Sequence, residues 1–78
     1  MEEKVKSIIA EYLGLKIEDI KLDMGLVEDL NINSYDIMSI VSLFEEEFNI
    51  EVPDTDIRLF QRVNDIVEYI KKRNFWFI

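Results

Sequence analysis

The stretch that decides the fold runs from residue 33 to residue 49 and reads NSYDIMSIVSLFEEEFN. Its large apolar residues recur every three or four positions, which is the spacing of one helix face: Ile37, Ile40, Val41, Phe44 and Phe48. Asn33 is a favourable N-cap, and Asp36, at the third helical position, completes a pattern similar to a capping box. Asn49 is suited to end the helix. An amphipathic helix is therefore predicted between Asn33 and Asn49.

A weaker pattern precedes this helix. Apolar residues at helical spacing mark residues 3–13 as a first helix, and Gly14 is a natural stop. Residues 15–32 have no clean period and form a long connection between the two helices. Because this connection is rich in Leu and Ile, we expect it to pack against the domain as a helix-covering loop.

Two further helices are predicted after the central one. Asp54 or Thr55 is suited to cap a short third helix, which we expect to end at Leu59 or Phe60. A last helix follows from Val63, where apolar residues again recur at helical spacing. No stretch indicates a strand. The sequence predicts an all-α fold, a small bundle of three longer helices and one short helix, with a long loop between the first and the second.

The composition excludes most kinds of chemistry. The chain has 78 residues, enough for one small domain, and contains no cysteine and no histidine. These absences exclude disulfides, zinc sites of the Cys/His type, thiol nucleophiles and histidine-based triads. With no base, nucleophile pair or metal cluster visible, we expect neither an enzyme nor a metal site. No signal peptide or transmembrane segment is visible, so the expected protein is soluble and cytoplasmic. We also expect it to be a monomer.

The negative charge is concentrated in one part of the chain. The formal net charge is −8, and residues 22–57 contain no Lys or Arg but ten acids: Asp23, Glu28, Asp29, Asp36, Glu45, Glu46, Glu47, Glu51, Asp54 and Asp56. The remainder has nine bases against seven acids. Such a field repels nucleic acid and steers basic protein surfaces toward the chain. A solubilising surface is the alternative explanation.

Ser34 is the single residue that looks able to carry chemistry. It lies at the predicted start of the central helix, where the dipole and the free backbone amides favour negative charge. An exposed hydroxyl is well placed there to carry a phosphate ester. A serine at a helix start is also common as a cap, which is the alternative.

The order of these motifs resembles that of acyl carrier proteins, over about residues 5–70 and without a gap. Residues 5–14 resemble the first helix of that family. Residues 26–35 read LVEDLNINSY, similar to the family's Val-Glu-Asp-Leu, followed after two residues by Asp-Ser-Leu. Residues 44–54 read FEEEFNIEVPD, similar to Leu-Glu-Glu-Glu-Phe-x-Ile-x-Ile-Pro-Asp. Residues 63–70 resemble the closing helix.

The resemblance implies a carrier and not a catalyst. It implies that a phosphopantetheinyl transferase attaches 4′-phosphopantetheine to Ser34 through a phosphodiester. The arm ends in a thiol that holds acyl groups as thioesters, so a chain without cysteine can take part in thioester chemistry. The other implied partners are acyl-transferring and acyl-processing enzymes with basic surfaces. The implied pathway is fatty-acid synthesis or a specialised route to lipopolysaccharide, other lipids, polyketides or secondary metabolites.

The resemblance also implies a partner-facing side of the central helix: Tyr35, Asp36, Met38, Ser42, Glu45 and Glu46. Several positions depart from the family pattern, and three of them bear on modification and partner contact. Asn33 replaces an aspartate that is thought to help hold the magnesium used during modification. Tyr35 replaces a leucine, and Ser42 a common methionine. These departures favour a dedicated pathway with a restricted set of partner enzymes.

By the same resemblance, the apolar helix faces can part to admit an acyl chain. The candidate lining residues are Ile37, Ile40, Val41, Phe44, Phe48, Leu59 and Ile66. The same residues would form the hydrophobic core of any helical bundle, which is the alternative interpretation. Phe44 stands where leucine is frequent in the family and could shorten or redirect such a cavity.

The C-terminus carries an unusual apolar tail. We expect a domain over residues 1–74 and a tail over residues 75–78, which reads FWFI. The tail either packs on the domain or serves as a docking peg for a partner or a membrane interface.

Two other functions stay open for the whole chain. An unmodified acidic module would regulate or scaffold a basic partner, and its binding would weaken with salt but survive loss of the Ser34 hydroxyl. A peptidyl or aminoacyl carrier would use the same arm, although the strong acidity and the Glu-Glu-Glu-Phe run favour an acyl carrier.

Overall fold

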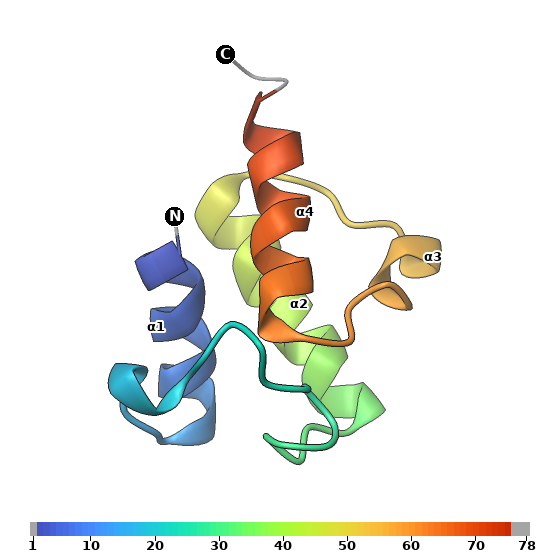
Figure 1. The fold of residues 1–78 in the computed structure, drawn as a ribbon. Coiled ribbons are helices and arrows are strands. Elements are labelled where there is room, and N and C mark those ends of the chain that lie inside the picture. Colours follow the sequence, from blue (N-terminus) through green and yellow to red (C-terminus); the bar gives the residue numbers. More distant parts are fainter. Residues whose placement is uncertain (1, 76–78) are drawn as a thin grey trace.

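Four helices form the fold, which a computed structural model describes for residues 2–75. In chain order the elements are α1 (Glu2–Leu13), the 3₁₀ turn η1 (Ile17–Asp19), α2 (Ser34–Phe48), α3 (Asp54–Ile57) and α4 (Val63–Phe75). In Figure 1, α4 crosses in front of α2, with α1 on one side of this pair and α3 on the other. The predicted all-α bundle of three longer helices and one short helix is confirmed, as is the long loop before α2.

The core is built from apolar side chains of the three long helices and of the loops between them. Its members are Val5, Ile9, Ala10, Ile20, Leu26, Ile32, Ile40, Val41, Phe44, Ile50, Val52, Phe60, Val63, Ile66, Val67 and Ile70. Ile20, Leu26 and Ile32 belong to the long loop, so its predicted packing against the domain is confirmed. No polar side chain in the described part of the chain is fully buried. Burial of apolar surface is therefore the main stabilising contribution.

Both ends of α2 are set by residues that the sequence pattern singled out. The Asn33 side chain accepts a hydrogen bond from the Asp36 backbone N–H at 2.8 Å, and the Asp36 carboxylate accepts one from the Asn33 N–H at 3.5 Å. This reciprocal pair is a capping box, as predicted. Asn49 ends the helix in the left-handed conformation at φ 53°, which asparagine tolerates better than most residues.

The short helix α3 differs from its prediction at both ends. It begins at Asp54 after Pro53, and no side chain caps it, so the predicted cap at Asp54 or Thr55 is wrong. It ends at Ile57, before the predicted Leu59 or Phe60. The reason is tertiary, because Phe60 is buried in the core and the chain must turn to bring it there. The backbone N–H groups of Leu59 and Phe60 make this turn by donating to carbonyls three residues earlier, at 3.0 and 3.1 Å.

The long loop is joined to the segment before α4 by backbone hydrogen bonds. The Leu26 N–H donates to the Gln61 carbonyl at 2.9 Å, and the Val63 N–H donates to the Met24 carbonyl at 3.1 Å. These bonds flank one isolated antiparallel bridge, and no strand occurs between residues 2 and 75. The Asp65 carboxylate accepts from the N–H groups just before α4 and so caps that helix without a preceding Ser or Thr.

The remaining expectations concern membranes and the C-terminal tail. None of the helices within residues 2–75 combines the length and the apolar character needed to cross a bilayer. The predicted tail over residues 75–78 lies outside the described residues except for the helical backbone of Phe75, so its two interpretations stay predictions.

Candidate functional site

Ser34 is the first residue of α2, and its side chain is exposed. The neighbouring Asn33 provides the N-cap, so the Ser34 hydroxyl is not the group that caps the helix. This separation leaves the hydroxyl open to solvent at the end of a long helix whose free amides favour a phosphate. The residues present therefore fit a phosphodiester-linked group on the Ser34 oxygen.

Asp36 links this helix end to α1. Its carboxylate accepts a hydrogen bond from the Tyr12 hydroxyl at 3.0 Å, in addition to its part in the capping box. The start of α2 is thus fixed by one local and one long-range polar contact. Both contacts engage Asp36 within the fold, which leaves its half-buried carboxylate less available to a partner than the sequence pattern suggested.

The predicted partner-facing residues divide into two groups. Tyr35 is 77% exposed and Met38 is 50% exposed, so both present apolar surface near Ser34. Ser42 and Glu46 are also exposed. Glu45 instead is half-buried and accepts a hydrogen bond from the Val52 N–H at 2.9 Å, which ties α2 to the segment before α3.

A small apolar cavity lies between the helices, and the α2 residues that line it follow Ser34 in the sequence. It is lined by Ile9, Leu26, Ile32, Ile37, Ile40, Val41, Phe60 and Ile66. Four of the predicted lining residues are in this set, whereas Phe44, Phe48 and Leu59 are not. Phe44 is buried elsewhere in the core, and Leu59 is 62% exposed.

The cavity includes residues that periodicity alone could not find. Leu26, Ile32 and Phe60 come from connecting segments, where no helical repeat exists to mark them. Their only signal was a large apolar side chain in a loop. The cavity volume is about 10 Å³, which is about the space that one water molecule requires. An acyl chain would therefore need the walls to move.

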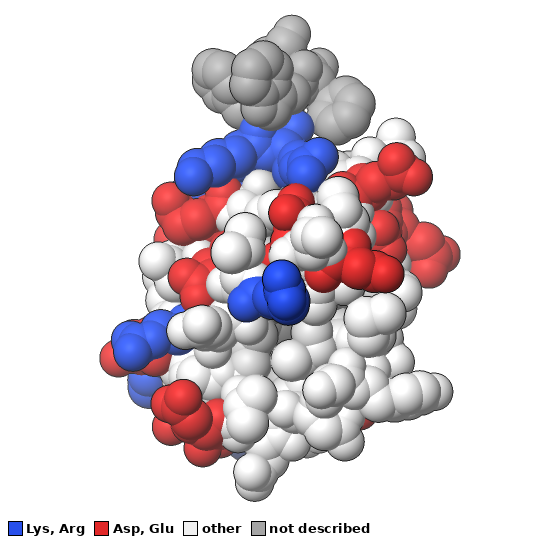
Figure 2. All heavy atoms as spheres, turned by 90° about the vertical axis from the view of Figure 1, so that its right-hand side faces the viewer, with Lys and Arg blue, Asp and Glu red and all other residues white. Residues whose placement is uncertain are grey.

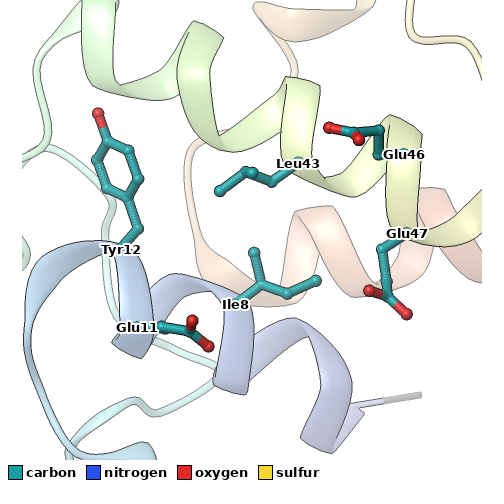
Figure 3. A pocket seen from close by; sticks show the side chains of 6 residues that line it. All are labelled: Ile8, Glu11, Tyr12, Leu43, Glu46 and Glu47. Carbon is teal, nitrogen blue, oxygen red and sulfur yellow. The ribbon is translucent and has the colours of Figure 1, made fainter.

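A separate, open groove runs between α1 and α2. Figure 3 shows its lining side chains, with Ile8, Glu11 and Tyr12 from α1 facing Leu43, Glu46 and Glu47 from α2. Its volume is about 520 Å³. Lys4 forms an ion pair with Glu47 at 2.9 Å. The groove was not predicted, because it depends on how the two helices pack.

Charge is unevenly distributed over the surface that includes α3. Figure 2 shows acidic side chains across the upper half of this face, with a basic band where α4 ends. Lys72 and Arg73 lie in that last turn. In this view the lower right of the face is uncharged, whereas acidic and basic side chains lie at its lower left.

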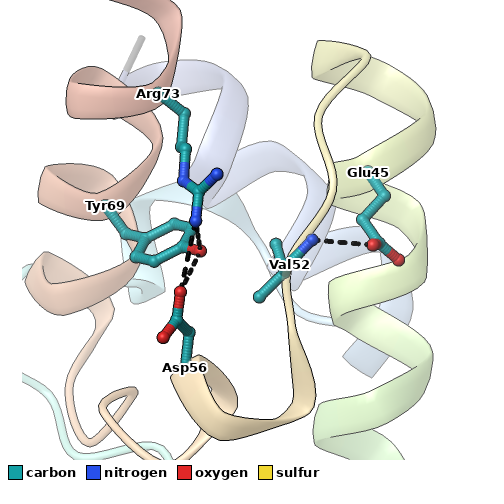
Figure 4. Close-up of polar contacts among 5 residues, drawn as sticks. All are labelled: Glu45, Val52, Asp56, Tyr69 and Arg73. Carbon is teal, nitrogen blue, oxygen red and sulfur yellow. Dashed lines mark hydrogen bonds and ion pairs between the residues drawn. The ribbon is translucent and has the colours of Figure 1, made fainter.

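A cluster of three polar side chains joins α3 to α4, shown in Figure 4. The Tyr69 hydroxyl donates to the Asp56 carboxylate at 2.6 Å, and Arg73 donates to Asp56 at 3.2 Å and to the Tyr69 oxygen at 2.7 Å. The Arg73 guanidinium also lies 5.0 Å from the centre of the Tyr69 ring. We call Asp56, Tyr69 and Arg73 the clasp.

The clasp gives the protein a predictable loss of stability in alkali. Burial raises the pKa of Tyr69 above its ordinary value of 10.0, and the hydrogen bond to Asp56 raises it further, while the charge of Arg73 opposes both. The folded protein therefore holds this proton more tightly than the unfolded chain. The resulting stabilisation is fully present below about pH 10 and is lost as the pH rises through the raised pKa.

Urea unfolding of the wild type and Tyr69→Phe checks this prediction. The difference in free energy of unfolding between the two proteins should be constant below about pH 10 and should shrink above it. A difference that stays constant well above that pH would contradict the assignment.

Removing the N-cap of α2 should destabilise the protein without touching Ser34. Asn33→Ala is expected to lower the free energy of unfolding by about 1 kcal/mol, because the Asp36 N–H loses its partner. Asn33→Asp is the matched control and should retain nearly all of the stability, since aspartate caps equally well. Thermal unfolding measures both variants, and an equal loss in the two would argue against the capping role.

Comparison with known proteins places the chain in a family. Residues 3–70 match the family described as the phosphopantetheine attachment site. The chain is 44% identical over 72 residues to an acyl carrier protein from Akkermansia muciniphila, covering 92% of this chain and 90% of that protein. It is also 44% identical over 69 residues to an acyl carrier protein from Clostridium acetobutylicum, covering 88% of this chain and 90% of that protein.

The chain belongs to the acyl carrier proteins of the phosphopantetheine-binding family. It carries acyl groups on a phosphopantetheine arm and is not a catalyst. Family membership implies encounters with a phosphopantetheinyl transferase and with acyl-handling enzymes.

Proposed function

We propose that Ser34 is the residue that bears the 4′-phosphopantetheine arm. The observation that carries this proposal is the exposed hydroxyl at the first position of α2. This hydroxyl is not needed to cap the helix, because the Asn33 side chain forms the cap. When bound, the arm supplies the thiol that this cysteine-free chain lacks. The chain's own contribution is to hold the Ser34 oxygen at a rigid, electrostatically favourable helix end.

The test is the intact mass of the protein after incubation with a phosphopantetheinyl transferase, coenzyme A and magnesium. The mass should increase by one arm, and fragment masses should locate the added group on Ser34. A mass that never changes, combined with salt-sensitive binding to a basic partner, would support the unmodified acidic module instead.

We further propose that Tyr35, Met38, Ser42 and Glu46 form the surface that partner enzymes contact, with Asp36 and Glu45 at its edge. The exposed apolar surface of Tyr35 and Met38 beside Ser34 supports this assignment. The apolar and charged side chains of this surface differ from the family pattern, which favours a dedicated acyl pathway with few partner enzymes. We expect this pathway to be cytoplasmic. The rates at which several partner enzymes act on the Tyr35→Leu variant would test whether Tyr35 restricts the set of partners.

The C-terminal tail is proposed to pack on the domain. Deleting residues 75–78 should then lower the melting temperature by several degrees, because four bulky apolar residues would no longer contribute buried surface. Differential scanning calorimetry of the full chain and the truncated chain gives the comparison. An unchanged melting temperature would instead favour the docking peg.

A further inference from the structure

Phe60, the last residue of the segment over residues 53–60, forms one wall of the apolar cavity, and this segment is anchored at both ends. At one end the Val52 N–H donates to the Glu45 carboxylate, and at the other the Leu26 N–H donates to the Gln61 carbonyl, both at 2.9 Å. Between these anchors, the hydrogen bonds that join the segment to other described residues all end on the Asp56 carboxylate. Asp56 is thus the polar tie that holds this wall against α4.

The clasp is connected to the cavity through a pair of aromatic rings. Phe60 is 6% exposed and lines the cavity. Its ring packs edge-on against the ring of Tyr69, with the centroids 5.1 Å apart. The hydroxyl on that same Tyr69 ring is the group that donates to Asp56. A displacement of Phe60 outward from the cavity must therefore disturb the clasp.

The other walls of the cavity resist movement more strongly. They are carried by α1, by α2 with 15 residues and by α4 with 13 residues, together with the long loop. The α3 helix has only four residues and ends in a turn. Local opening takes place most readily where few backbone bonds and contacts must break. The wall over residues 53–60 is accordingly the part that would move when the cavity of about 10 Å³ enlarges.

We propose that Asp56, Tyr69 and Arg73 are positioning residues whose clasp limits the outward movement of Phe60, and that they thereby set the length of acyl chain this carrier can bury. This inference rests on the proposed function, because the chain must first be loaded through the arm. Weakening the clasp should let the cavity accept longer chains. The charge-assisted bonds to Asp56 make the effect large enough to measure, since they are stronger than neutral ones.

The first experiment uses amide hydrogen exchange of the unloaded protein and does not depend on the arm. In Tyr69→Phe and Asp56→Ala, the amides of Leu59 and Phe60 should exchange about tenfold faster than in the wild type. The matched control is Asp54→Ala, which removes an exposed carboxylate from the same short helix and should leave these rates unchanged. Unchanged exchange in the clasp variants, or an equal acceleration at Ile9 in α1, would overturn the proposal.

The second experiment loads the holo protein with saturated acyl groups from butyryl to palmitoyl and measures thioester cleavage by hydroxylamine. In the wild type, cleavage should slow with chain length up to a limit and then become fast again. In Tyr69→Phe the limit should move to longer acyl chains. Thioesters just beyond the wild-type limit should then be cleaved severalfold more slowly than in the wild type, whereas Asp54→Ala should match the wild type. An identical limit in Tyr69→Phe and the wild type would overturn the role in cargo length.

The two experiments separate failure of this inference from failure of the proposed function. If no arm can be attached to Ser34, the proposed function fails and the cargo role falls with it, while hydrogen exchange still decides whether the clasp holds the wall. If the arm is attached and the limit does not move, the proposed function stands and the clasp is merely structural.

Discussion

Ser34→Ala is expected to abolish attachment of the phosphopantetheine arm completely while leaving the fold intact. The hydroxyl oxygen is the only atom of this side chain that can form the phosphodiester, so no attachment of the arm at this residue should remain. The stability should stay within about 0.5 kcal/mol of the wild type, because the residue is exposed and Asn33 makes the helix cap. Intact mass and thermal unfolding measure the two effects separately.

Ser39→Ala is the matched control for this experiment. Ser39 lies in the same helix, is half-buried and belongs to none of the proposed contact surfaces. It should accept the arm at the wild-type rate. If Ser34→Ala still gained the mass of one arm, another hydroxyl would be the attachment point and the proposed site would be wrong.

Phe44→Ala should produce the largest loss of stability of any single truncation in α2. Phe44 is 2% exposed and is the largest of the fully buried side chains. Truncation of such a phenylalanine costs about 3–5 kcal/mol through lost transfer energy and an unfilled cavity. A domain of this size has a total stability on the order of 4–12 kcal/mol, so the truncation should remove a quarter or more of it and lower the melting temperature by about 12–40 °C.

Phe48→Ala provides the comparison, because Phe48 is half-buried and its ring lies 6.3 Å from that of Phe44. Its truncation should cost clearly less. Phe44→Leu should also be milder, since most of the buried volume is kept. Urea unfolding of the three variants ranks them, and equal losses for Phe44→Ala and Phe48→Ala would show that the core is not centred where the structure places it.

The helix patterns predicted most of the architecture because they are local. The period of α2 and its two caps involve residues within a few positions of one another, and all were confirmed. The packing of the long loop also followed from its composition. The end of α3 was predicted wrongly, since burial of Phe60 overrides the local signal there.

The candidate site was only partly predictable. Ser34 could be singled out as the proposed attachment point because the motifs around it, and not its helix position alone, resemble those of the family. Asp36 and Glu45 looked like partner contacts, yet both are engaged in hydrogen bonds within the fold. An acidic side chain on a helix gives no sign of whether an N–H or a hydroxyl from another element will reach it.

The sequence by itself determined the helical class, the limits of α2 and the family, since each depends on neighbours along the chain. It also singled out Ser34 as the residue proposed for modification. Only the tertiary structure decided which side chains line the cavity, that Phe60 and not Leu59 faces it, and that Asp56 meets Tyr69 and Arg73. These features join residues far apart in sequence. Their geometry arises from the packing of helices around a shared core, which no local pattern encodes.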